Sequence, residues 1–355
     1  MAKKLMIMPS ARSRYVKDEN MKLIYSLLLF ISAIMIVTNW YMYGFMYGLK
    51  LVLMILVGLF ITREMEILFY THDKDIDRAQ AKELIQKSYY KVTALLFILL
   101  IPVGTPLWLT GVGAIIATLL GKLLFGGFHH MVFHSSLVGY IFLTEGWRAL
   151  VSGVKFTTAF DNYLLNLIFN NDFFNNTLYI GRLFGEASPV FNVDTYQTAL
   201  SNTSSIPYSM EAIMLGLVPG ITVSGLVLLG MLLFMIIKKT VNFILPITII
   251  GSFLVTAFII GDFSLEFVMY QLFSGMFLFV VVFITTDPIT TPIPTKGKII
   301  FGVIAGALTM IIRNGVQYEE GVVFAVLFMM MLTPMLNQML KKKPVKKVPK
   351  KDVGA

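Results

Sequence analysis

A carboxylate and several threonines gather at the end of an apolar run, in the segment 283–292. Proline disfavours helical geometry in the residue before it and removes a backbone donor, so Pro288 predicts a helix end near Asp287. The carbonyl groups freed by that helix end, the threonine hydroxyls and the Asp287 carboxylate would then meet at one depth. Such a group is typical of a cofactor or cation site, and the alternative is a solvated helix end.

A second polar interruption lies inside the apolar run 210–237, at Pro219, Gly220 and Thr222. Glycine lets another group approach the backbone closely. The hydroxyls of Thr222 and Ser224 can face a ligand, or they can donate to carbonyl groups of their own helix. Both interpretations stay open for each hydroxyl.

Three of the four histidines follow Gly126 and Gly127, within residues 129–134. On a helix, His130 and His134 would share one face and could ligate a metal. Because neither a carboxylate nor a thiolate is near them in the sequence, packed or interfacial imidazoles are the favoured alternative.

Two carboxylates, Glu64 and Glu66, lie near the end of the apolar run 49–69. Carboxylates at membrane depth are costly and are typical of ion or proton pathways. Their nearness to the edge of the run makes simple solvation an equal alternative.

The composition describes the protein in which these groups must be positioned. Of 355 residues, 57% are apolar and 14% are charged, whereas about 25% are charged in soluble domains. The sequence therefore predicts a polytopic membrane protein.

The sequence contains no Cys, which excludes thiolate-ligated iron–sulfur clusters, Cys-based zinc sites, disulfides and thiol nucleophiles. The net charge of +9 comes largely from basic residues beside apolar runs and in the tail 341–351, which favours binding to the lipid surface over nucleic acid.

We expect an all-α fold with about ten transmembrane helices. The predicted spans are 22–39, 49–69, 92–103, 107–120, 131–143, 210–237, 242–261, 266–285, 299–313 and 321–340. The run 92–103 would rise only about 18 Å as a helix, against a hydrocarbon core of about 30 Å. Together with the prolines of 101–106 and the glycine pair at 126–127, this predicts broken or re-entrant helices that line a protein-enclosed cavity.

The distribution of basic residues predicts the orientation. An even number of crossings places both termini on one side, together with all but five of the 29 Lys and Arg residues. The five on the opposite side are Lys50, Arg148, Lys155, Arg182 and Arg313. By the positive-inside rule, both termini are cytoplasmic and the protein is a multi-pass protein of the cytoplasmic membrane.

This topology divides the chain into five parts. They are a cytoplasmic N-terminal segment (1–21), a first five-helix half (22–143), an extracytoplasmic loop (144–206), a second five-helix half (207–340) and a cytoplasmic polybasic tail (341–355). Because each half has an odd number of spans, the two halves would be inverted with respect to each other.

Three segments of the chain resemble one family of membrane subunits. The segments are 120–137, 277–288, and 318–327 followed by Pro334, with Pro219 and Gly220 between them. They are similar to the D subunit of Rnf electron-transport complexes and to the B subunit of the sodium-pumping NADH:quinone oxidoreductase. The segments follow one another in the order found in that family, and together they cover most of residues 100–340. The chain is identified as a divergent member of this family.

The resemblance implies a covalent flavin on the external loop. In the family, a threonine in a Ser-Gly-Ala-Thr motif carries FMN through a phosphoester that a separate flavin transferase installs. Aligned without gaps, Thr198 takes the place of that threonine, and Thr195, Tyr196 and Gln197 take the places of Ser, Gly and Ala. The neighbouring residues Asn192 and Asp194 would be recognised by the transferase.

The resemblance also implies a second, noncovalent flavin such as riboflavin in the membrane. Its cavity would be shaped by Gly126, Gly127, Pro219, Gly220, Thr222 and Asp287. The protein would relay electrons as a non-autonomous subunit of a ferredoxin:NAD⁺ or NADH:quinone oxidoreductase that moves Na⁺ or H⁺. Its partners would be the other membrane and peripheral subunits of the complex.

Two other functions fit the same residues. Inverted five-span halves with broken helices also describe small-solute channels and transporters. A structural subunit could hold flavin-bearing partners without a cofactor of its own. Visible flavin absorbance of the purified protein would favour the electron carrier, and solute flux through colourless protein would favour the channel.

Overall fold

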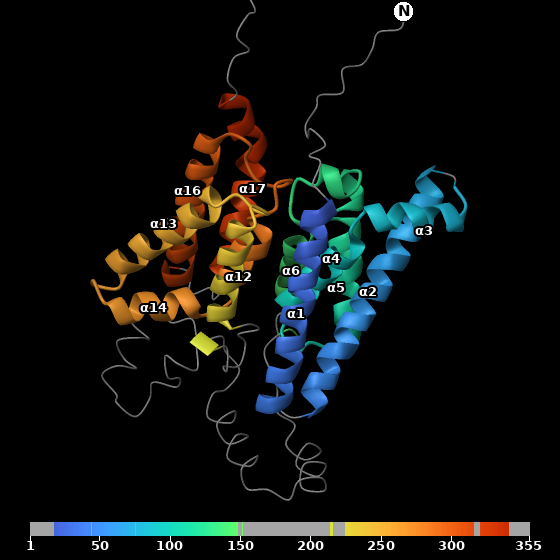
Figure 1. The fold of residues 1–355 in the computed structure, drawn as a ribbon, viewed down its shortest axis with the longest axis horizontal. Coiled ribbons are helices and arrows are strands. Elements are labelled where there is room, and N and C mark those ends of the chain that lie inside the picture. The colour runs from blue at the N-terminus through green and yellow to red at the C-terminus, as the bar shows by residue number, and fades with distance from the viewer. Residues whose placement is uncertain are drawn as a thin grey trace, which may run out of the picture.

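A computed structural model describes residues 18–43, 45–74, 76–147, 151, 214–215, 224–315 and 320–340. Within these ranges every regular element is a helix (Figure 1). The described part of the chain thus confirms the all-helical fold that the sequence predicts. The extracytoplasmic loop predicted over 144–206 lies almost entirely outside the described residues.

The first half, α1 to α6, begins with a hairpin of two long helices. They are α1 (Asp18–Tyr43) and α2 (Phe45–Lys74). The following helices are shorter: α3 (Arg78–Lys87), α4 (Tyr90–Leu100), α5 (Leu107–Leu119), the 3₁₀ turns η1 (Leu123–Phe125) and η2 (Phe128–His130), and α6 (Ser135–Gly146). As predicted, α4 ends before Pro102 and α5 begins directly after Pro106, because proline restricts the preceding residue and is tolerated at a helix start.

The second half, α12 to α17, contains a bent helix pair. Its elements are α12 (Gly225–Ile237), α13 (Ile244–Ile260), α14 (Leu265–Phe273), α15 (Phe277–Phe279), the π-helix η3 (Val280–Ile284), α16 (Thr295–Gly315) and α17 (Gly321–Met339). The span predicted over 266–285 corresponds to this pair, in which the chain bends by 62° between α14 and α15, so the pair is a broken span or a re-entrant loop. The bend contains Gly275 at φ 66°, a left-handed conformation that ends helices and favours glycine.

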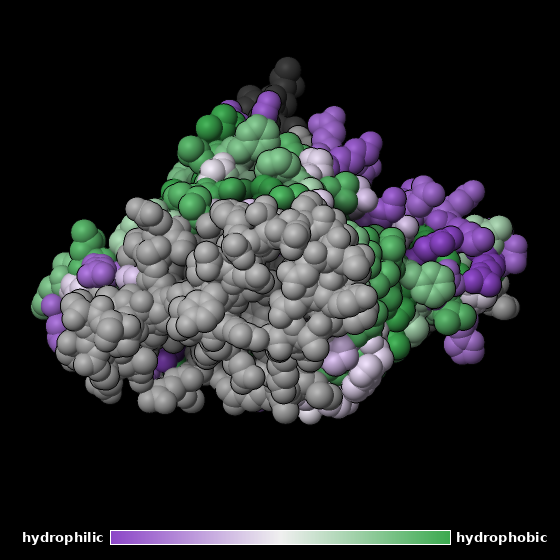
Figure 2. Space-filling model, turned by 90° about the horizontal axis from the view of Figure 1, so that it is seen from below, coloured by the Kyte–Doolittle hydropathy of each residue, from purple (hydrophilic) through white to green (hydrophobic). Residues whose placement is uncertain are grey.

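Five described helices are long and apolar enough to cross a membrane, or six if the bent pair counts as one. The others that were predicted to span are shorter apolar helices, such as α4, α12 and α13. Large hydrophobic side chains lie exposed along the long helices, among them Phe30 and Phe60, and hydrophobic surface extends along the flanks in Figure 2. Exposed apolar surface of this extent marks a lipid-facing protein. The chain is therefore a polytopic membrane protein, and the count of ten spans stays a prediction.

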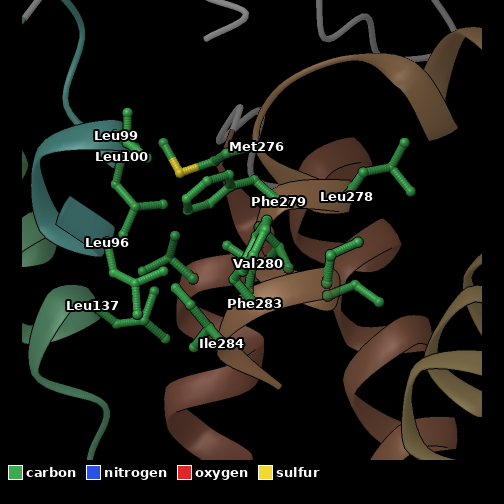
Figure 3. Close-up of a cluster of buried hydrophobic side chains, with 14 of the residues drawn as sticks. Leu96, Leu99, Leu100, Leu137, Met276, Leu278, Phe279, Val280, Phe283 and Ile284 are labelled. Atoms are coloured by element: carbon green, nitrogen blue, oxygen red, sulfur yellow. The ribbon is translucent and has the colours of Figure 1, made fainter. Parts of the chain in front are cut away.

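The two halves meet between α4 of the first half and the α15–η3 segment of the second (Figure 3). All residues of α4 from Val92 to Leu100 are buried, and so are those of α15 and η3. Figure 3 shows Leu96, Leu99 and Leu100 of α4 facing Phe279 and Phe283. A helix that is apolar on all sides belongs in the interior, and these short helices form the centre of the molecule.

The long helices fix the direction of the bundle. In Figure 1, α17 ends at the top of the molecule, and α1 begins lower but also in its upper half. The helices α3 and α14 lie across this direction, α3 at the upper right and α14 at the lower left. Figure 2 shows hydrophilic side chains gathered at the right, over α3, whose residues Arg78, Lys82 and Glu83 are exposed.

Candidate ligand cavity between the two halves

A cavity of about 530 Å³ opens between the two halves. The first half contributes residues of α1, α4 and the segment 128–135, and the second half contributes 238–241 and 283–288. Exposed Glu19, Lys238 and Lys239 lie at its mouth, while buried Phe128 and Phe283 lie deeper. The cavity thus combines an apolar, aromatic interior with a charged entrance, at the place where the broken helices end.

The first wall depends on the predicted glycine pair. Gly126 and Gly127 have φ of 96° and 99°, a region that residues with a side chain rarely adopt. A Cβ on Gly127 would also lie 3.1 Å from the hydroxyl oxygen of Tyr70. The turn brings the next residues, Phe128 and Met131, to the cavity. The glycines therefore shape the wall, and the side chains that follow them form it.

The histidines do not form the helical pair that their spacing predicts. His130 ends η2, whereas His134 has an extended backbone and precedes α6, so the prediction that both lie on one helix face is wrong. The predicted helix 131–143 begins only at Ser135 because the glycine turn occupies the preceding segment. Among the described residues no group of three potential metal-binding side chains occurs.

His134 nevertheless belongs to the cavity. Its side chain is buried, lines the cavity, and its Nδ1 atom has no hydrogen-bond partner within the described ranges. Buried polar atoms are normally hydrogen-bonded. An atom of this kind beside a cavity is available to a ligand that donates or accepts a hydrogen bond.

The second wall contains Asp287, at the helix end that the sequence predicts. The hydroxyls of Thr285 and Thr286 donate to the carbonyl oxygens four residues earlier, at 2.8 and 2.7 Å. Asp287 Oδ1 accepts a hydrogen bond from the backbone N–H of Ile289 at 3.1 Å. Local bonds thus use both threonine hydroxyls. Thr286 and Asp287 still line the cavity.

One hydrogen bond joins the two halves at the mouth. The Asn20 side-chain amide donates to the carbonyl oxygen of Thr240 at 3.3 Å. It ties the start of α1 to the connection between α12 and α13. In that connection Lys239 has φ 56°, which is uncommon for a residue with a side chain.

Behind the first wall lies a buried ion pair that the sequence did not predict. Lys122 is fully buried, and its Nζ lies 2.6 Å from Glu66 Oε1. The same atom donates to the Ser88 carbonyl oxygen at 2.6 Å and to Thr93 Oγ1 at 3.3 Å. It also lies 5.4 Å from the centre of the Phe128 ring. Lys122 therefore holds two residues of the cavity wall.

These contacts change how several charges are interpreted. Lys122 is among the basic residues that the sequence assigns to the cytoplasmic side, but its charge is buried inside the first half and is not exposed there. Of the two candidate carboxylates, Glu66 is buried with Lys122, whereas Glu64 binds the largely exposed Arg78 at 2.6 Å. Lys122 is a lone lysine within the apolar span 107–125. This was the signal in the sequence that could have predicted the ion pair, since a charge inside a membrane span requires a partner.

The other predicted site residues lie outside the described residues. They are Asn192, Asp194, Thr195, Thr198, Pro219, Gly220 and Thr222. Their roles stay predictions. Of the predicted cavity residues within the described ranges, Asp287 lines the cavity, whereas Gly126 and Gly127 do not line it and lie directly before Phe128, which does.

Comparison with known proteins identifies the family. A model of the NQR2, RnfD, RnfE family matches residues 11–346. The chain belongs to this family. Membership in the NQR2, RnfD, RnfE family confirms the resemblance found in the sequence, and the match extends over both halves and the segment between them.

Relatives of this chain include D subunits of ion-translocating oxidoreductase complexes. The relative from Actinobacillus succinogenes is 30% identical over 261 residues, which cover 68% of this chain and 73% of the relative. The relative from Buchnera aphidicola subsp. Acyrthosiphon pisum is 26% identical over 315 residues, covering 82% and 86%. That from Colwellia psychrerythraea is 30% identical over 268 residues, covering 68% and 72%. The family thus includes subunits of ion-translocating oxidoreductases.

Proposed function

We propose that this member of the NQR2, RnfD, RnfE family relays electrons through bound flavin in an ion-translocating oxidoreductase complex. Two considerations support the proposal. The named relatives are subunits of such complexes, and the cavity between the two halves suits a flavin. Its coupled ion is Na⁺ or H⁺, and its partners are the other membrane and peripheral subunits of the complex.

The cavity is the observation that carries the proposal. Its volume of about 530 Å³ lies within the range of about 300–1,000 Å³ that is typical of cofactor sites. Phe128, Phe283 and Met131 offer apolar surface for a planar ring system. His134, Thr286 and Asp287 offer hydrogen-bonding groups at its edge. These residues would hold a noncovalent flavin such as riboflavin, which when bound accepts and donates one or two electrons.

A second flavin, covalent FMN, is proposed at Thr198. A tether suits an extracytoplasmic site, where a flavin that dissociated would be lost. The test is the mass of the tryptic peptide that contains Thr198, from cells that also express the flavin transferase. We expect the mass increment of an FMN phosphoester, lost in Thr198→Ala. An unmodified peptide under these conditions would remove the anchor assignment.

The cavity flavin has its own test. After denaturation of the purified Thr198→Ala complex, we expect noncovalent flavin to be released in an amount equal to that from the unmodified protein. Colourless protein that still assembles with its partners would instead indicate the cofactor-free structural subunit. Colourless protein that conducts solutes in vesicles would indicate a channel.

The layout that we propose has ten spans, two inverted halves and cytoplasmic termini. It is supported by the start of α1 and the end of α17, which both lie in the upper half of the molecule (Figure 1). It is also supported by two of the five basic residues assigned to the opposite side, because both are bound within the fold. Lys50 Nζ donates to the Gly104 carbonyl oxygen at 2.9 Å, and Arg313 is buried. Without these two residues, the exposed Lys and Arg side chains are distributed more unequally between the two sides than the count from the sequence indicates. A reporter fused near residue 190 that is active only in the cytosol would contradict this layout.

A further inference from the structure

The two halves contain helix breaks of the same design. In the first half, α3 ends at the C-cap Ser88, Tyr89 takes the left-handed conformation at φ 52°, and α4 begins at Tyr90. In the second half, α14 ends at the C-cap Ser274, Gly275 takes φ 66°, and α15 begins at Phe277. Figure 1 places these breaks toward opposite ends of the bundle.

Each break receives a buried cation from the same place in its half. Lys122 follows α5, the first helix after the broken pair, and donates to the Ser88 carbonyl oxygen at 2.6 Å. Arg313 lies in the last turn of α16, the first helix after the other broken pair. Its Nη2 donates to the Ser274 carbonyl oxygen at 3.2 Å. In both halves a cation therefore bonds to the carbonyl group of the serine that ends the first helix.

The need for these cations follows from the helix ends. The last carbonyl groups of a helix have no partner within that helix, and in an apolar interior such groups must be satisfied by protein. A positive charge at a helix C-terminus is also favoured by the helix dipole. Arg313 Nη1 adds a bond to the carbonyl oxygen of Gln271 at 2.7 Å.

Aromatic rings and carboxylates accompany both cations. Lys122 lies over Phe128 and pairs with Glu66, and Arg313 lies 5.5 Å from the ring centre of Phe253. At the second break, the Glu320 carboxylate accepts a hydrogen bond from the backbone N–H of Met276 at 3.2 Å. The two breaks thus share the cation, the serine carbonyl, the ring and the acidic side chain, although the carboxylates come from different helices.

The breaks differ in their relation to the cavity. Thr93 and Phe128, which Lys122 contacts, line the cavity. The described partners of Arg313, such as Ser274 and Phe253, are not among the residues that line it. Within the described ranges, the cation at the first break thus contacts residues that line the cavity, whereas Ser274 and Phe253 at the second break lie away from it.

We propose that Lys122 and Arg313 are equivalent positioning residues of two inverted halves. Each fixes the helix break of its own half by bonding to the C-cap serine carbonyl. Lys122 has the additional role of holding Thr93 and Phe128 in the geometry that binds the cavity ligand. Only this additional role rests on the proposed function, since it takes the ligand to be a flavin.

The absence of Cys from the sequence allows each break to be followed separately. Ser88→Cys and Ser274→Cys introduce single reporters at the two C-caps, where both serines are buried. The rate of maleimide labelling is measured on the full chain in its membrane complex. We expect Lys122→Met to accelerate labelling at position 88 at least tenfold and to leave position 274 unchanged. Arg313→Met should accelerate labelling at position 274 at least tenfold and leave position 88 unchanged.

Two controls separate this role from general instability. Lys122→Arg keeps a donor and should restore most of the protection at position 88. Lys122→Met combined with Glu66→Met removes both charges, and labelling at 88 should stay fast because the Ser88 carbonyl still lacks its donor. Equal acceleration at both positions, or restored protection in the double variant, would overturn the proposal.

The ligand role is tested with riboflavin as the probe. It is titrated into the purified complex from which noncovalent flavin has been removed, and quenching of its fluorescence gives the dissociation constant. Lys122→Met should weaken binding at least tenfold, and Arg313→Met less than twofold. If the unmodified complex does not bind riboflavin, the ligand role and the proposed cavity flavin are both wrong, while the labelling pattern still decides the role of the cations at the breaks.

Discussion

The helix breaks of the two halves meet one physical need with different chemistry. The first uses a lysine paired with one carboxylate at 2.6 Å. The second uses an arginine that donates to the backbone carbonyl groups of Gln271 and Ser274 and to the Gln271 side chain, and its guanidinium lies near two phenylalanine rings. Buried carbonyl groups at a helix end require a donor, but they do not dictate which cation supplies it. The difference shows that the position of the cation is set by the fold, while its type is set by its neighbours.

The largest effect is expected where a charge would be left alone. Lys122→Met leaves the fully buried Glu66 carboxylate without its partner, and breaking a buried ion pair in this way costs about 3–5 kcal/mol. We expect a large fall in the thermal unfolding temperature of the detergent-solubilised complex, followed by size-exclusion fluorescence. The double variant with Lys122→Met and Glu66→Met should recover part of the lost unfolding temperature, because it leaves no unpaired buried charge. A single variant as stable as the parent would contradict the ion pair.

The next effect contrasts the helix packing of the two halves. A Cβ on Gly306 of α16 would overlap both Ser252 Oγ and the backbone carbonyl of Ile249 on α13, so Gly306→Ala should cost about 1–3 kcal/mol through overpacking. A Cβ on Gly111 of α5 would lie 2.8 Å from the end of the Ile61 side chain, which can move, and at an ordinary contact distance of 3.9 Å from Val57 Cγ1. Gly111→Ala should therefore be nearly neutral in the same unfolding measurement. Equal costs would show that the two helix pairs are packed alike.

A smaller effect separates the residues with positive φ at the two breaks. Gly275→Ala places a Cβ at φ 66°, about 3.1 Å from Arg313 Nη2, and left-handed geometry costs a residue with a side chain about 1–2 kcal/mol. Tyr89→Gly removes that strain at φ 52° but loses the ring contact with Phe128. We expect Gly275→Ala to lower stability and Tyr89→Gly to change it little. Thermal unfolding of the two single variants measures the difference, and the reverse order would contradict it.

The smallest effect concerns the bond between the halves. Asn20→Ala removes the hydrogen bond to the Thr240 carbonyl oxygen, and a bond of this kind contributes about 0.5–1.5 kcal/mol. The free energy of unfolding should fall slightly in Asn20→Ala. The matched control is Asn242→Ala, because the Asn242 side chain accepts a local hydrogen bond from the backbone N–H of Ile244. Hydrogen exchange of residues 238–241 should increase in Asn20→Ala alone. Equal exchange in both variants would show that the bond does not tie the halves.

Local signals in the sequence predicted the parts of the fold that local chemistry controls. The prolines at 102 and 106 predicted the interruption between α4 and α5, and Pro288 predicted the helix end near Asp287. The Gly126–Gly127 pair predicted a break, since two consecutive residues with positive φ need glycine. Family membership also followed from these segments.

Features that depend on distant partners could not be predicted in the same way. Gly275 is a single glycine in an apolar run, and the carbonyl group of Ser274 beside it accepts a hydrogen bond from Arg313, 39 residues further along the chain. Lys122 resembles a loop charge until Glu66, 56 residues earlier, is placed beside it. The equivalence of Lys122 and Arg313 is equally hidden, because the two residues differ in type and in spacing from their serines.

The inverted arrangement of the two halves is tested most directly by labelling from the two sides of the membrane. Glu83 on α3 and Glu266 on α14 are both exposed, so Glu83→Cys and Glu266→Cys give single reporters in a chain without Cys. A membrane-impermeant maleimide should label the Glu266→Cys variant in intact cells and the Glu83→Cys variant only in inside-out vesicles. Labelling of both variants from the same side would contradict the inverted arrangement.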